Sequence, residues 1–410
     1  MFCKSGNQLN NFIGKKVEGI VKKLVDDFNP ESIIADGSLG KGEITINKTQ
    51  ENFVMCSDFD LQIVTNKRIT GPEMLSYSDE ISEIFGFEVN VRRTVPEIFS
   101  EESNKDLKYS YKIPSISTYE RKYSSKTLYG KDFIRYIPEI DHAKIPIWEG
   151  IRLIFNRVGE FLGTAKSVYL DLNSDNDFNI SDDGYHKYVY SKNKCVLACM
   201  DAILITNHDY HWSLERKVEN LKDIMKSRQD NIPALSSEME KTLYDAVEFK
   251  IKGQYTNNQI SDSQMVKLVE KTLQFIVNKE LNLNLNNWLS FPSSWVKSPK
   301  VNSYYYRGPT PSVFYQNGIV IAKILLLRKF FPSWRLFTIP FVCWPHLMYG
   351  TLPLLLFTIE PKENKTKYLR VVRRNFSNIA SLKAPSSDYW KEWDYLSDIG
   401  NKIWYTLALV

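Results

Sequence analysis

The spacing of hydrophobic positions over the first 145 residues predicts a sheet with flanking helices. Apolar residues recur at helical spacing over residues 12–28 and again over 72–85, where Pro72 suits the first turn of a helix and Gly86 its end. Three runs are typical of strands because they are short and apolar, or alternate apolar with polar residues: 32–35, 57–64 and 87–91. This mixture of helices and strands predicts the α+β class.

The rest of the chain has a different pattern. Residues 146–280 place apolar side chains at helical spacing in several long segments, which predicts a helical bundle. Residues 281–410 are rich in aromatic side chains, and the stretch 336–359 carries no formal charge apart from His346. That stretch is long enough to cross a bilayer. Its three prolines favour instead a buried core segment, broken into short strands or turns.

Composition narrows the class of protein. At 410 residues the chain is too long for one ordinary core, so we expect three parts, at 1–145, 146–280 and 281–410. The net charge of +5 is small, which suits an anionic small substrate and gives no reason to expect a nucleic-acid partner. Five cysteines without a C-x-x-C pair, and a polar N-terminus, predict reduced thiols in the cytoplasm. The five histidines show no zinc-ligand spacing.

Acidic residues provide the first sign of chemistry. Asp58 and Asp60 lie two apart on a predicted strand, so both side chains leave the same face and repel each other unless a cation lies between them. Mg²⁺ suits this arrangement because it takes a few carboxylates together with substrate phosphates. Glu88, in the middle of the third predicted strand, would point into the same cleft. Three carboxylates can hold two ions, Mg²⁺ or Mn²⁺, which promote in-line displacement at a phosphate.

A glycine-rich turn precedes these acids. Gly37, Ser38 and Gly40 follow the first predicted strand, where backbone N–H groups and a hydroxyl can hold a polyphosphate. The glycines allow the backbone to approach the phosphates, and Ser38 would donate to a β- or γ-phosphate oxygen. The alternative is an ordinary turn beside two exposed acids on an edge strand.

The segments 37–43 and 57–61 together resemble the DNA polymerase β-like nucleotidyltransferase superfamily, whose signature is a strand, Gly-Ser, a short helix, Asp-x-Asp and a later acid. They are most similar to its prokaryotic branch of minimal and antibiotic-type members. Fourteen residues separate Glu43 from Asp58, more than in the minimal members, so we expect an extra hairpin over residues 44–54.

The resemblance extends past the first domain. Residues 128–132 and 152–157 resemble segments that follow the catalytic domain in large bacterial and archaeal relatives, and they nominate Lys131 and Arg157 as nucleotide-binding cations. For both, a solvated charge or a structural ion pair is the alternative. Residues 190–205 resemble the helical partner domains of the kanamycin nucleotidyltransferase and HEPN type. HEPN ribonucleases use an Arg followed closely by His, which this segment lacks, so ribonuclease activity is not predicted.

The resemblance implies an enzyme that transfers a nucleoside monophosphate from an NTP, with ATP the first choice, to a hydroxyl acceptor and releases pyrophosphate. The acceptor could be a small molecule, a sugar or a protein, and the base preference and oligomeric state are not predicted. Two other hypotheses stay open. One is a catalytically inactive, nucleotide-binding regulatory module. The other is a membrane-surface assembly protein, with peripheral membrane contact through residues 336–359.

Overall fold

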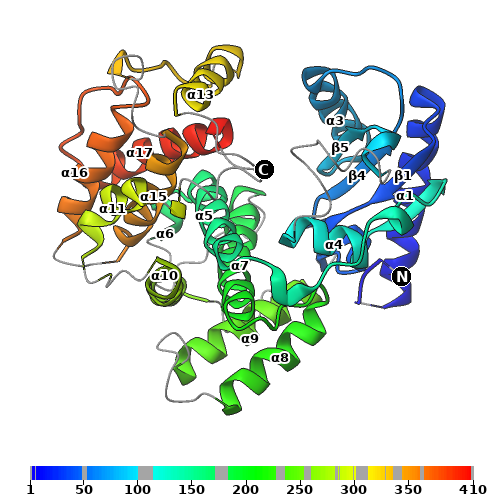
Figure 1. The fold of residues 1–410 in the computed structure, drawn as a ribbon, viewed down its shortest axis with the longest axis horizontal. Helices are drawn as coiled ribbons and strands as arrows, with labels where there is room; N and C mark the ends of the chain where they lie inside the picture. The colour runs from blue at the N-terminus through cyan, green and yellow to red at the C-terminus, as the bar shows by residue number, and fades with distance from the viewer. Residues whose placement is uncertain are drawn as a thin grey trace. The chain divides into compact units, whose positions relative to one another are not determined.

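The chain folds into two compact units in the computed structural model (Figure 1). Unit 1 consists of Met1–Pro146, Asn207–Lys226 and Tyr244–Gln259. Unit 2 consists of Ile147–Thr206, Ser227–Leu243 and Ile260–Val410, and so includes most of the second and third predicted parts. The structure describes residues 2–4, 6–48, 53–99, 114–170, 183–227, 236–253, 260–281, 285, 287–298, 300–301, 313–327, 329–335, 344–360 and 364–407.

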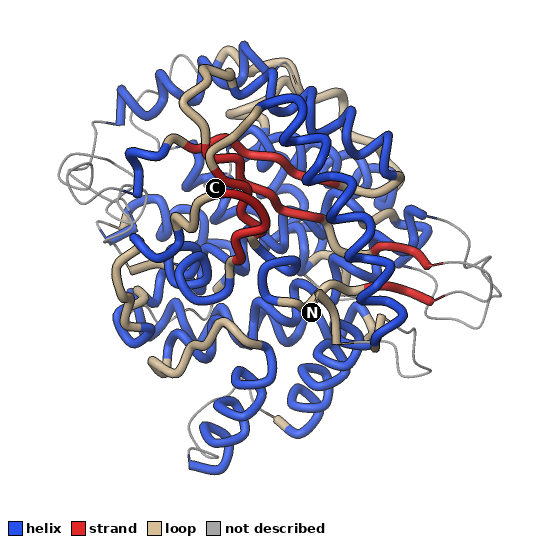
Figure 2. Tube along the Cα trace, turned by 90° about the vertical axis from the view of Figure 1, so that its right-hand side faces the viewer, coloured by secondary structure: helices blue, strands red, loops and turns tan. Residues whose placement is uncertain are grey.

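Unit 1 contains a mixed sheet with the strand order β5-β4-β1-β6 among the described residues (Figure 2). The central strand β1 (Ser32–Ala35) runs antiparallel to both of its neighbours, β4 (Phe59–Val64) and β6 (Lys126–Gly130). The edge strand β5 (Val89–Thr94) runs parallel to β4. Parallel neighbours need a crossover connection, which helix α3 supplies here.

Two long helices, α1 (Asn7–Phe28) and α3 (Gly71–Phe85), cover one face of this sheet (Figure 1). Both correspond to helices that the sequence predicts, although α1 begins five residues earlier. Thr70 and Glu73 form a reciprocal capping box at the start of α3, and Gly86 ends the helix in a left-handed conformation with φ of 76°. Local signals therefore define both ends of α3.

The alternation of side chains along β4 determines which face of the sheet is covered. Phe59, Leu61 and Ile63 are buried in the core formed with α1 and α3. Since successive side chains of a strand point to opposite faces, Asp60 and Gln62 lie on the other face. The acidic positions are thus turned away from the helix-covered side.

The third strand differs from its prediction. It begins at Val89, so Glu88 directly precedes the strand rather than occupying its middle, and the Glu88 side chain is exposed.

The expected hairpin over 44–54 is confirmed, because β2 (Ile46–Lys48) pairs antiparallel with β3 (Phe53–Met55). Unit 1 also contains α2 (Gly37–Lys41), η1 (Pro96–Phe99), α4 (Ile116–Ser124), η3 (Ile134–Tyr136), η4 (His142–Lys144), α8 (Leu214–Ser227) and the second half of α9 (Ser237–Lys252).

The described part of unit 2 is helical. Helices α5 (Ile147–Thr164) and α7 (Asp183–Thr206) pack along each other (Figure 1), and a Cβ at Gly150 would lie only 2.9 Å from the Cα atom of Ala202. The glycine therefore permits the close approach. The other helices are α6 (Ser167–Leu170), α10 (Asp262–Leu281), η6 (Trp288–Ser290), α11 (Phe291–Lys297), α13 (Val313–Leu327), α15 (Trp344–Phe357), α16 (Lys365–Phe376) and α17 (Tyr389–Leu407).

Helix α15 accounts for most of the uncharged stretch 336–359, of which 336–343 lies outside the described residues. Every residue of α15 is buried, and the helix packs against α5, α11, α16 and α17. Burial of Trp344 and Leu354 agrees with the expected core segment, but the expected short strands or turns are wrong because one helix continues through Pro353. Among the described helices, none combines the length and the apolar character needed to cross a bilayer.

Candidate active site

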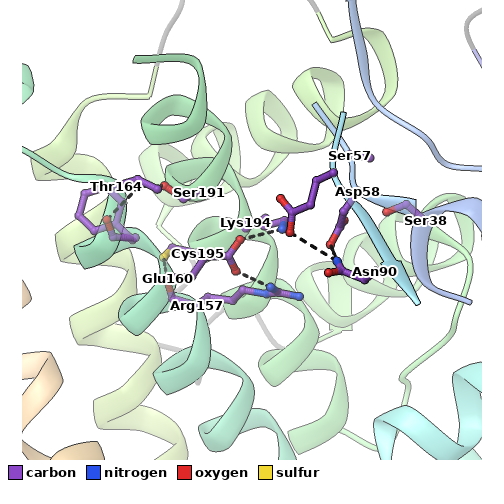
Figure 3. A network of polar contacts seen from close by, with 12 residues as sticks. Ser38, Ser57, Asp58, Asn90, Arg157, Glu160, Thr164, Ser191, Lys194 and Cys195 are labelled. Carbon is purple, nitrogen blue, oxygen red and sulfur yellow. Dashed lines mark hydrogen bonds and ion pairs between the residues drawn. The ribbon is translucent and has the colours of Figure 1, made fainter. Parts of the chain in front are cut away.

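The two aspartates and the third acid lie at neighbouring ends of β4 and β5. The register pairs Phe59 with Val89, and the Phe59 N–H donates to the Glu88 carbonyl oxygen at 3.0 Å. Asn90 Nδ2 donates to Asp58 Oδ2 at 3.1 Å and to Glu88 Oε1 at 3.4 Å, and Figure 3 shows the Asp58 carboxylate pointing toward Asn90. The amide therefore links Asp58 with Glu88 on the face of the sheet opposite α1 and α3.

The Gly37–Ser38 turn lies directly on the second aspartate. The Asp36 N–H donates to the Asp60 carbonyl oxygen at 2.9 Å, which aligns the end of β1 with β4. Gly37 has φ of 57°, and a Cβ at this position would lie 2.6 Å from Asp60 Oδ2. A side chain here would be strained and would press on the carboxylate. The structure thus brings together Gly37, Ser38 and Asp60, as the sequence predicts.

Gly40 has a packing role in the structure. A Cβ on Gly40 would lie 2.7 Å from the Ala35 carbonyl oxygen and 2.9 Å from that of Ser124. Both atoms belong to the backbone, so they cannot rotate away. Gly40 therefore lets α2 pack closely against β1 and the end of α4.

Sequence reasoning missed Lys250, on helix α9. Its Nζ atom donates to Ser38 Oγ at 3.0 Å and to Ser57 Oγ at 3.2 Å. Thr45 Oγ1 donates to the Lys250 carbonyl oxygen at 2.9 Å, which fixes the end of α9 beside the β2–β3 hairpin. Lys250 follows Ser38 by 212 residues, so no local pattern could have paired them.

Two ion pairs fix the position of α2. Arg121 Nη2 contacts Asp36 Oδ2 at 3.1 Å, just before the turn. Lys41 Nζ, at the end of α2, contacts Glu120 Oε1 at 2.5 Å. Burial alone would raise the pKa of Glu120, but the charges of Lys41 and Lys217 outweigh burial and lower it. Helix α4 therefore holds both ends of α2 through charge.

Lys131, one of the two predicted nucleotide-binding cations, lies at the other end of β1. The register pairs Ser32 with Gly130 and Ala35 with Lys126, whereas the Gly37–Ser38 turn follows Ala35. The Lys131 ammonium lies 4.8 Å from the centre of the Phe133 ring. The structure does not bring Lys131 to the turn. Lys126 of β6 pairs with Ala35, so it lies at the end of β1 from which the Gly37–Ser38 turn continues. Burial lowers the pKa of Lys126.

Arg157, the other predicted cation, belongs to helix α5 of unit 2. Its Nη1 atom contacts Glu160 Oε2 at 2.5 Å, while Lys194 Nζ contacts Glu160 Oε1 at 2.7 Å (Figure 3). Burial alone would raise the pKa of Glu160, but the charges of Arg157 and Lys194 lower it to about 2. Arg157 therefore takes part in an ion-pair network within unit 2.

The donor set around β4 fits a divalent cation shared with a substrate. In the part of the chain that the structure describes, no group of three or more His, Cys, Asp or Glu side chains could by itself hold a metal ion. Asp58 and Asp60 flank the buried Phe59 and offer two carboxylates next to a turn without a side chain at Gly37. Mg²⁺ commonly takes only one or two carboxylates from a protein and its other ligands from phosphates and water.

Comparison with known proteins adds no relative. No protein-family model, no curated protein and no solved structure matches the chain. Function is therefore inferred from the side chains that the fold brings together around β1, β4 and α9.

Proposed function

We propose that the chain is a metal-dependent nucleotidyltransferase, which transfers a nucleoside monophosphate from an NTP to a hydroxyl acceptor and releases pyrophosphate. The observation that carries this proposal is the contact of the Gly37–Ser38 turn with the Asp60 carboxylate on one side and the Lys250 ammonium on the other. The Asp60 carboxylate can bind a cation, and the nearby Ser38 hydroxyl and Lys250 ammonium can donate to phosphate oxygens.

In this proposal, Ser38 and Lys250 bind the leaving part of the triphosphate. The Lys250 ammonium donates to the hydroxyl oxygens of Ser38 and Ser57, and it has three N–H donors to distribute. A phosphate oxygen would accept from Lys250 and from the Ser38 hydroxyl together. Such charge-assisted hydrogen bonds would stabilise the negative charge that builds up on pyrophosphate as it leaves.

Asp58 and Asp60 would hold the metal, with Glu88 as the proposed third carboxylate joined to Asp58 through Asn90. A bound Mg²⁺ or Mn²⁺ pair would neutralise charge at the α-phosphate and favour deprotonation of the acceptor hydroxyl. The acceptor oxygen then forms a bond to the α-phosphorus while the bond to the β-phosphate oxygen breaks. Because Gly37 has no side chain, this residue does not press on the Asp60 carboxylate.

Incubation with each α-labelled NTP, Mg²⁺ or Mn²⁺ and a cell extract tests the proposal. We expect transfer of the label to an acceptor and release of pyrophosphate in equal amount, with ATP the first candidate donor. The labelled product would also reveal the acceptor class, whether small molecule, sugar or protein. Metal-dependent NTP binding without pyrophosphate release would indicate a regulatory nucleotide-binding module instead. Absence of NTP binding would refute both.

A further inference from the structure

Unit 2 exposes a group of large apolar side chains around the end of α13. Leu326 is 80% exposed, Phe331 83% and Trp334 69%. Leu325 and Leu327, the sequence neighbours of Leu326, are exposed as well. Single exposed apolar residues are normal on a protein surface, whereas five within one stretch of ten residues give a reason to expect an interaction site. We call residues 325–327, 331 and 334 the apolar patch.

The backbone that carries Phe331 and Trp334 is held in place. The Ser333 N–H donates to the Ile379 carbonyl oxygen at 3.0 Å, and the Ser381 N–H donates to that of Phe331 at 2.8 Å. Ser333 itself is buried between the two exposed aromatic residues. The rings of Phe331 and Trp334 are therefore presented to solvent by a fixed segment, which lowers the entropic cost of inserting them into a partner.

Exposed cations lie close to the apolar patch along the chain. Lys323 lies three residues before Leu326 on α13, and Lys329 and Arg335 lie within the following segment, all exposed. Arg335 Nη1 lies 3.5 Å from Asn378 Oδ1. Asn378 follows the exposed Arg374 of α16 by four residues, so a further cation is near in the chain. The sequence ranges 313–335 and 364–383 together contain ten Lys and Arg and no Asp or Glu, against a net charge of only +5 for the whole chain.

We propose that the apolar patch docks on an anionic membrane surface. Phe, Trp and Leu side chains enter the boundary between headgroups and acyl chains, while nearby Lys and Arg bind the phosphates and carboxylates of the headgroups. Lipid fits better than nucleic acid because Leu325, Leu326 and Leu327 offer exposed aliphatic carbon, whereas bases stack on aromatic rings. This docking does not depend on nucleotidyl transfer.

The docking surface differs from the segment in which the sequence suggested membrane contact. Within 336–359, the described helix α15 is buried on all sides by its neighbours, so its apolar side chains are not available to lipid. The apolar patch precedes that segment and faces solvent. Peripheral contact through exposed side chains needs no helix that crosses the bilayer.

Sedimentation of the full chain with lipid vesicles tests the docking. We expect the protein to pellet with vesicles that contain phosphatidylserine and to stay in solution with phosphatidylcholine alone. The double variant Phe331→Ser/Trp334→Ser should lower the partition coefficient about tenfold or more, since it removes two aromatic rings from the interface. Val168→Ser, at an exposed apolar position on α6, is the matched control and should bind as the wild type does.

Charge-reversal variants measure how much the cations contribute to vesicle binding, separately from the apolar side chains. Lys329→Glu and Arg374→Glu should each weaken binding to anionic vesicles by about tenfold or more. Lys241→Glu, at an exposed position on α9, should change it little. Thermal unfolding monitored by circular dichroism verifies that each variant is folded, and the charge variants decide the outcome if the double variant melts early.

Two results would overturn the proposal. The first is equal pelleting of the wild type, the patch variants and the controls, or no pelleting with anionic vesicles. The second is binding to single-stranded RNA that requires Phe331 and Trp334 without any binding to vesicles, which would assign the apolar patch to nucleic acid. Nucleotidyl transfer measured on the same preparations reports separately on the active site.

Discussion

At the residue scale, the candidate site depends on contacts that join distant parts of the chain. Ser38 accepts a hydrogen bond from Lys250, and its neighbour Gly37 packs on the Asp60 carboxylate. Groups of opposite charge therefore lie close to two neighbouring residues of one turn. In a metal–triphosphate complex the metal ion is positive and the phosphates are negative. The metal ion therefore matches Asp60 and the phosphates match Lys250, so we propose that the triphosphate binds at this turn.

Replacement of Lys250 by Met should weaken apparent NTP affinity more than it slows turnover, because the proposed contact is made to the β- or γ-phosphate. Loss of one hydrogen bond to a charged group costs about 1.5–3 kcal/mol, equivalent to roughly tenfold to a hundredfold in affinity. Ser38→Ala should act in the same direction, since it removes the hydroxyl that Lys250 contacts. Steady-state kinetics with varied NTP would measure both effects.

Lys252→Met is the matched control for Lys250. Lys252 lies two residues later on the same helix and forms an exposed ion pair with Glu248 at 2.5 Å. Its replacement should leave NTP affinity within about twofold of the wild type, since exposed ion pairs contribute little. Unchanged affinity in Lys250→Met, with reduced turnover, would remove Lys250 from triphosphate binding.

At the element scale, sequence signals predicted the elements whose ends are determined locally. Pro72 and Gly86 indicated the two ends of α3, and the spacing between Glu43 and Asp58 predicted the β2–β3 hairpin. The start of β5 was predicted too early because no capping or turn residue marks it after Gly86. Strand pairing with β4, a tertiary contact, determines that Val89 is the first paired residue.

The contribution of α9 and the exposure of the apolar patch could not be predicted from local pattern. Lys250 is one of several lysines on an amphipathic helix, and only the packing of α9 beside Thr45 distinguishes it. Leu326 belongs to an apolar run, residues 318–327, whose sequence resembles core. The continuation of α15 through Pro353 was missed because burial on all sides compensates for a proline that an isolated helix would not tolerate.

Gly40→Ala should destabilise unit 1 and displace α2. The added Cβ would lie 2.7 Å and 2.9 Å from two backbone carbonyl oxygens, so the surrounding elements must move. Overpacking of this kind typically costs about 1–3 kcal/mol. Chemical denaturation should report this loss, and nucleotidyl transfer should fall because Gly37 and Ser38 precede Gly40 on the same short helix.

Gly71→Ala provides the comparison, because a Cβ at Gly71 meets no atom within 4 Å. This variant should be as stable as the wild type or slightly more stable, since alanine restricts the unfolded chain. If Gly40→Ala proves as harmless as Gly71→Ala, the close packing of α2 on β1 and α4 is wrong.

At the scale of the whole molecule, an ion-pair network in unit 2 makes the stability of the fold depend on pH. In unit 2, Glu160 is enclosed by Arg157 and Lys194, and its side chain is 25% exposed. Its pKa of about 2 lies below the ordinary value of 4.5, so the folded state binds the proton more weakly than the unfolded state does. Glu160 therefore stabilises the fold above about pH 4.5, and this stabilisation is lost as pH falls toward 2.

Glu160→Gln should accordingly be less stable than the wild type at pH 7 by about 1 kcal/mol, once the partial exposure of the ion pair is taken into account. The difference should shrink between pH 4.5 and pH 2 as the wild-type carboxylate is protonated. Urea denaturation across this range measures it. Glu219→Gln, in an exposed pair with Arg216, should show a much smaller difference at pH 7.

A difference between Glu160→Gln and the wild type that does not change with pH would contradict the ion-pair network. It would indicate that the variant loses packing rather than charge.

The proposed nucleotidyl transfer depends above all on Asp58 and Asp60. The most direct test compares pyrophosphate release from ATP with Mg²⁺ and cell extract by the wild type, Asp58→Asn, Asp60→Asn and the control Asp79→Asn, whose side chain is exposed on α3. We predict release by the wild type and the control, and none by the two site variants. All four should unfold at similar temperatures, because removing one of two neighbouring negative charges does not harm the metal-free fold. Near-normal release by either site variant would contradict the account, as would the absence of release by the wild type with every NTP.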